Sequence, residues 1–84
     1  MNIEDHLNLR EALVLNHAYF QILKTAFEQR LEQVGGAAVM LDAVVEIALI
    51  AGYKGSMDMA ASILKLEGGF IVEPMPSGRL TVRR

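Results

Sequence analysis

The chain has no cysteine and no tryptophan, only two prolines, and fewer basic than acidic residues. The absence of cysteine excludes disulfide bonds and thiolate metal sites. Eight lysines and arginines against ten acids leave a net charge of −2, whereas domains that bind nucleic acid through phosphates are mostly basic. The longest apolar run, residues 35–52, is interrupted by Asp42 and Glu46, so no membrane span is expected.

What the chain does have is apolar residues, which make up 52% of its 84 positions. This composition excludes a disordered chain, and the length predicts one small domain over residues 1–84. The apolar fraction exceeds what one small core needs, so we expect some of it to be covered by a partner. The acidic start, Met1–Asp5, does not resemble a secretory signal, and we expect a cytoplasmic protein.

Residues 3–34 predict one long helix, because apolar residues recur at spacings of three, four and seven until Gly35 and Gly36 end the pattern. Such a helix measures roughly 40–48 Å, but a domain of this size is only about 30 Å across. Either the helix breaks near residues 16–17, or it continues and packs against a second subunit. We favour a homodimer, with an interface at Leu13, Phe20, Leu23 and Phe27.

Two further helices are predicted. Residues 37–51 are apolar nearly all round, which is typical of a central helix, and Gly52 ends it. Ser56 is a good N-cap for a helix over residues 57–67, which Gly68 and Gly69 end. We expect its buried side to include Ala60, Ile63, Leu64 and Leu66, leaving Asp58, Ala61, Ser62 and Lys65 outside.

The C-terminal segment predicts a β-hairpin. Residues 70–75 and 79–83 flank Pro76-Ser77-Gly78, which suits a three-residue loop with a left-handed glycine. The register pairs Val72 with Val82 and leaves Pro74 on an edge. The fold class is therefore mainly α with a two-stranded C-terminal hairpin, an α+β protein.

The spacing of Ala48 and Gly52 resembles the first helix and turn of helix-turn-helix domains. The segments 63–72 and 78–82 resemble the recognition helix and wing of bacterial winged-helix regulators. The resemblance covers residues 37–84 and implies a winged-helix-like DNA-binding domain. The turn at residues 52–56 is longer than that pattern has, and an unrelated helix bundle carrying a hairpin is the alternative fold.

The resemblance implies a transcriptional regulator or accessory factor, with DNA contacts from the turn, third helix and hairpin: Lys54, Ser56, Ser62, Lys65, Arg79, Arg83 and Arg84. The alternative interpretation is that these charges are ordinary solvated ones, balanced by nearby acids: Asp42, Glu46, Asp58, Glu67 and Glu73. In that case the chain is a dimeric, non-enzymatic protein–protein interaction module, with Met57 and Met59 as adaptable contacts.

No catalytic, metal or cofactor site is predicted. His6 and His17 are eleven residues apart and cannot share a metal from one helix. A site that combines His17 with Asp42 and Glu46 is less favoured than solvated side chains. No nucleophile accompanies the carboxylates and no phosphate-loop pattern follows the glycine pairs, so we expect neither an enzyme nor a cofactor.

Overall fold

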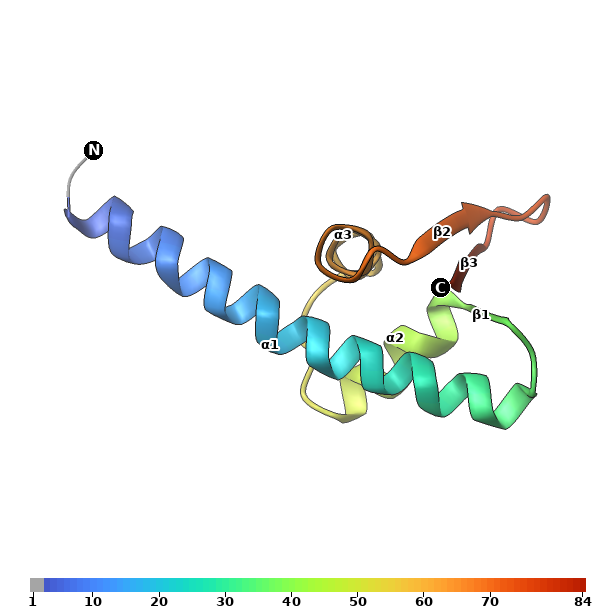
Figure 1. The fold of residues 1–84 in the computed structure, drawn as a ribbon. Coiled ribbons are helices and arrows are strands. Elements are labelled where there is room, and N and C mark those ends of the chain that lie inside the picture. Colours follow the sequence, from blue (N-terminus) through green and yellow to red (C-terminus); the bar gives the residue numbers. More distant parts are fainter. Residues whose placement is uncertain (1–2) are drawn as a thin grey trace.

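The structure is a computed structural model that describes the backbone of residues 3–84 and the side chains of residues 15–84. Three helices and three strands form an α+β fold (Figure 1). In chain order they are α1 (Ile3–Val34), β1 (Ala38–Met40), α2 (Leu41–Ile50), α3 (Met57–Gly68), β2 (Ile71–Pro74) and β3 (Leu80–Arg83).

Helix α1 is unbroken, so of the two alternatives the continuous helix holds and the break near residues 16–17 does not occur. Its 32 residues correspond to about 48 Å, and the molecule extends over 48 × 25 × 18 Å. Figure 1 shows the N-terminal part of α1 running out beyond α2, α3 and the sheet. The helix ends at the predicted glycine, because Gly35 takes a φ of 70° and its N–H donates to the Leu31 carbonyl at 2.9 Å.

The sheet has three antiparallel strands in the order β1-β3-β2, which corrects the prediction of a two-stranded wing. The helix expected over residues 37–51 begins only at Leu41, because Ala38–Met40 pairs with β3. In this ladder Val39 lies opposite Val82. A short apolar run does not distinguish a strand from a buried helix by periodicity, and its pairing partner lies more than forty residues away.

The hairpin follows the predicted register. Val72 pairs with Val82, and the Met75 N–H donates to the Arg79 carbonyl at 2.7 Å to close the loop. Gly78 has a φ of 89°, the left-handed conformation that the loop requires. Strand β2 lies at the edge of the sheet, where Pro74 needs no ladder partner for its nitrogen.

Helix α3 starts and ends close to the predicted residues. The Ser56 hydroxyl accepts from the Met59 N–H at 3.1 Å, and Gly69 takes the left-handed conformation after the last turn. Its rotation differs from the prediction, since Ala61 is buried and Leu66 is 86% exposed. The side of α3 that carries Ala60, Ala61 and Leu64 faces the core, and Leu66 lies on the opposite side.

The core lies where the three helices meet one face of the sheet. It includes Leu23, Phe27, Leu41, Val44, Ala48, Tyr53, Ala60, Leu64, Phe70 and Val82. The phenyl ring of Phe27 meets that of Phe70 edge to face, with ring centroids 5.0 Å apart.

This core corrects the predicted dimer interface. Leu23 and Phe27 have no exposed surface in a single chain, so neither side chain can contact a second subunit. Phe20 is half-buried and packs edge to face on Phe70 at 6.4 Å. The fourth predicted residue, Leu13, lies outside the side chains that the structure describes. A dimer contact through α1 therefore needs another face of the helix.

Candidate nucleic-acid interface

The predicted DNA contacts lie on three consecutive elements: the turn after α2, helix α3 and the β2–β3 hairpin. Helix α3 packs against β2, so the helix and the hairpin adjoin each other (Figure 1). The exposed face of α3 carries Asp58, Ser62, Lys65 and Leu66. Residues three or four positions apart lie on the same face of a helix, and Ser62 has this spacing from each of the other three. The structure thus brings the helix and the hairpin together, as an interface of this kind requires.

Two lysines of the predicted interface are accessible. Lys54 lies in the turn before α3 and Lys65 lies near the end of α3, and both side chains are exposed. Neither forms an ion pair with any carboxylate among residues 15–84. Over the side chains described, an external anion can contact either lysine without displacing a carboxylate.

The two predicted serines have different surroundings. The hydroxyl of Ser56 caps α3, and its carbonyl accepts a 2.7 Å hydrogen bond from the hydroxyl of buried Tyr53. Ser56 therefore fixes the turn and the first residues of α3. Ser62 lies exposed on the outer face of α3, between Asp58 and Lys65, and its hydroxyl is the one available to an external group.

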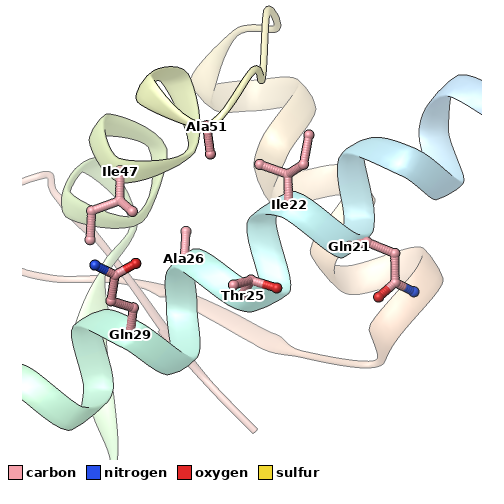
Figure 2. Close-up of a pocket in the computed structure, with 7 residues that line it drawn as sticks. All are labelled: Gln21, Ile22, Thr25, Ala26, Gln29, Ile47 and Ala51. Carbon is pink, nitrogen blue, oxygen red and sulfur yellow. The ribbon is translucent and has the colours of Figure 1, made fainter.

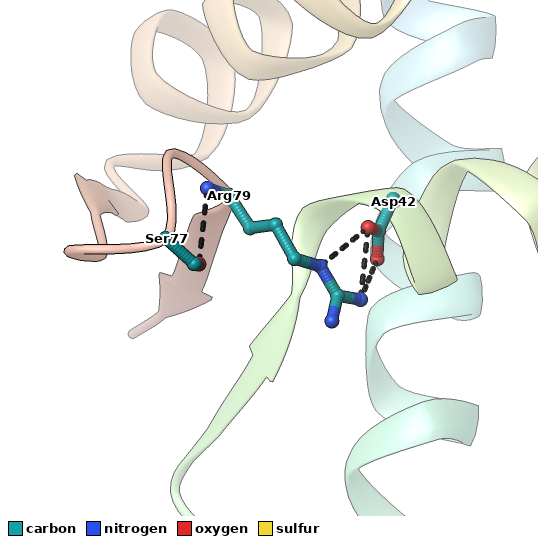
Figure 3. A network of polar contacts seen from close by, with 3 residues as sticks. All are labelled: Asp42, Ser77 and Arg79. Atoms are coloured by element: carbon teal, nitrogen blue, oxygen red, sulfur yellow. Dashed lines mark hydrogen bonds and ion pairs between the residues drawn. The ribbon is translucent and has the colours of Figure 1, made fainter.

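The hairpin arginine nearest the loop is tied to α2. Arg79 donates from Nε and Nη2 to the two carboxylate oxygens of Asp42, both at 2.9 Å (Figure 3). Its backbone N–H donates to the Ser77 hydroxyl at 3.4 Å. The hydrogen bonds from Arg79 lower the pKa of Asp42, and the same contact raises the pKa of Arg79. The pair joins the hairpin loop to the start of α2.

The other two arginines are also paired. Arg83 contacts Glu73 on the neighbouring strand at 2.9 Å. Arg84 contacts Glu28 on α1 at 3.3 Å, and its guanidinium lies 5.7 Å from the ring centre of Phe27. All three arginine side chains remain about half exposed. Exposed pairs of this kind are weak, so an external anion can compete for each arginine.

The sequence predicted surplus apolar surface and named Met57 as an exposed contact, but it did not identify the two most exposed apolar residues. Ile50 and Leu66 are 88% and 86% exposed, the highest values among the large apolar side chains described.

A groove of about 260 Å³ also opens between α1 and α2. This volume is below that of most small-molecule sites, about 300–1,000 Å³, so the groove suits side chains of a macromolecule better.

Over the described part of the chain, no helix is long and apolar enough to cross a membrane. In the same residues, no three His, Asp or Glu side chains come together as a metal site. The fold and its surface define an α+β protein of three helices and a three-stranded antiparallel sheet. Comparisons of the chain with family models, curated proteins and solved structures found no match.

Proposed function

We propose that this chain is a small, dimeric, winged-helix-like DNA-binding protein of the cytoplasm, a non-enzymatic transcriptional regulator or accessory factor. The observation that supports it is the order α2, turn, α3, β2–β3 hairpin, with Ser62 and Lys65 on an exposed α3 face beside the hairpin. In this proposal α3 enters the major groove and the hairpin lies along the backbone.

The charges set how tightly such a protein holds DNA. Each phosphate contact lowers the slope of log K against log salt by about 0.9. If only Lys54 and Lys65 contact phosphates, the slope is about −1.8 for each protomer. If the three hairpin arginines exchange their carboxylates for phosphates, five contacts give about −4.5. A moderate slope is expected, because Asp42, Glu73 and Glu28 compete with the phosphates.

The test is fluorescence anisotropy on mixed-sequence duplexes at salt concentrations from about 50 to about 200 mM. The affinity is measured at each salt concentration with the same series of protein concentrations. The double variant Lys54→Ala, Lys65→Ala is expected to flatten the salt slope by about 1.8 per protomer. The control is Lys24→Ala, the one other lysine of the chain, which lies on α1 and not on the turn, helix or hairpin of the proposed DNA interface. Absence of binding at micromolar protein in low salt, or an equal loss with the control, would contradict the proposal.

A protein–protein interaction module that does not bind DNA is the second candidate. The exposed apolar side chains of Ile50 and Leu66 favour it, as does the pairing of all three hairpin arginines with acids. A partner recovered from lysate after nuclease treatment, and lost with Leu66→Asp, would support this function. Recovery that depends on intact nucleic acid would support DNA binding instead.

A further inference from the structure

We propose that a second copy of this chain docks into the groove between α1 and α2, with the two α1 helices antiparallel and crossing at Ala18. Residues 7–14 of each α1 then lie against residues 22–29 of the other. The inference rests on the dimer proposed above and specifies the surface through which it forms.

The groove is apolar at its floor and continues into exposed apolar residues. Its lining side chains come from α1, from α2 and from the residue that follows α2 (Figure 2): Gln21, Ile22, Thr25, Ala26, Gln29, Ile47 and Ala51. Exposed Leu15 and Ala18 lie seven and four residues before Ile22, and exposed Ile50 lies three residues after Ile47. Residues at these spacings share one helix face, so the apolar strip runs past the groove on both helices.

The length of α1 indicates which segment fills the groove. Its N-terminal part extends beyond the body of the molecule (Figure 1). Most of the stability of a protein helix comes from tertiary packing, and this part of α1 extends away from the body of its own chain, so a second chain is the partner that can supply such packing. A two-fold dimer uses the same surface on both subunits. A crossing at residue 18 places position 7 opposite 29 and position 14 opposite 22, which matches the groove to the projecting segment.

The contact area between the two α1 helices is too small by itself for a specific interface. Pairing over residues 7–29 corresponds to about 35 Å of helix, with a contact strip about 10 Å wide. That strip is about 350 Å² on each subunit and about 700 Å² in total, below the roughly 1,000 Å² of a specific interface. Contacts from the α2 flank must supply the remainder, and Ile50, at 88% exposure, is the most exposed large apolar side chain of α2.

We place the crossing of the two helices at Ala18 because its side chain is small. Ala18 is exposed and small, and the distance between packed helix axes, about 8–10 Å, depends on the side chains at the contact, so a small residue allows the shorter distance. Leu15 and Ile22 flank it on the same face, so the crossing is bordered by apolar residues.

The first experiment measures mass by sedimentation equilibrium in the absence of DNA. The wild-type chain is expected at twice 9.2 kDa. Ile50→Asp removes an apolar anchor, and Ala18→Arg puts a bulky charge at the crossing. Each is expected to weaken dimerisation at least about 30-fold, the size of effect seen when an interface anchor is lost, and to shift the mass toward 9.2 kDa. The matched control is Leu66→Asp, because Leu66 is equally exposed but lies on α3. Circular dichroism checks that each variant is folded.

The second experiment uses the absence of cysteine from the chain. Ala18→Cys is expected to form an intermolecular disulfide under mild oxidation, because two residues at a helix crossing come within disulfide reach. The control is Gln33→Cys on the same helix, which lies about 45 Å from its symmetry copy in this arrangement. The control should stay uncrosslinked.

The outcomes separate the two proposals. A wild-type monomer at all concentrations would overturn both the dimer and its surface. A dimer that tolerates Ile50→Asp and Ala18→Arg, with no Ala18→Cys crosslink, would overturn only the α1–α2 surface. A dimer that behaves as expected but shows no affinity for DNA supports this inference and contradicts the DNA-binding function.

Discussion

Replacing Phe27 by alanine tests whether α1 belongs to the core of one chain. The Phe27 ring is fully buried, meets Phe70 edge to face and lies beneath the Arg84 guanidinium. Removing a buried phenylalanine costs about 3–5 kcal/mol. A chain of this length has a total stability of roughly 4–13 kcal/mol, so the variant loses a large share of it.

The assay is thermal or urea unfolding followed by circular dichroism. A loss of about 3–5 kcal/mol corresponds to a fall in Tm of roughly 12–40 °C for a domain this small. The comparison is Phe20→Ala, since Phe20 is only half-buried and packs on the same Phe70 ring from 6.4 Å. Its loss should be clearly smaller.

The same experiment separates a core residue from an interface residue. A core role for Phe27 predicts that the loss of Tm is the same at low and high protein concentration. An interface role predicts that the loss disappears in the monomer, since subunit contacts stabilise by mass action. A Phe27→Ala chain within about 1 kcal/mol of wild type would refute the packing described above.

Two other predictions concern single contacts. Helix propensity alone makes Gly68→Ala stabilising by about 1 kcal/mol, but the new Cβ would lie 2.7 Å from the ring of Phe70 and collide with Phe20. We therefore expect a lower Tm in thermal unfolding, and a higher Tm would contradict the close approach. Arg79 lowers the pKa of Asp42, so this pair stabilises the fold above the ordinary carboxyl pKa of about 3.9 and is lost as pH falls below it. Urea unfolding from pH 6 to 2 should show a shallower acid loss for Asp42→Asn than for wild type. Equal losses would mean that the pair contributes nothing.

The local signals of the chain predicted most of the helical boundaries and the hairpin. Gly35 and Gly69 end helices and Ser56 starts one, because these effects involve residues within one turn of each other. The loop at Gly78 set the pairing of Val72 with Val82 for the same reason. Among the candidate contacts, the sequence identified the accessible lysines but not the partners of the arginines.

The remaining features depend on residues far apart in the chain. Strand β1 forms because its backbone pairs with β3, and Asp42 binds Arg79 across 37 positions. The same holds for Phe27: its apolar pattern shows that one face of α1 must be covered, but not by which chain. Periodicity reports which side of a helix avoids water. Only the packed arrangement decides what covers that side, because burial depends on contacts between elements that no local pattern specifies.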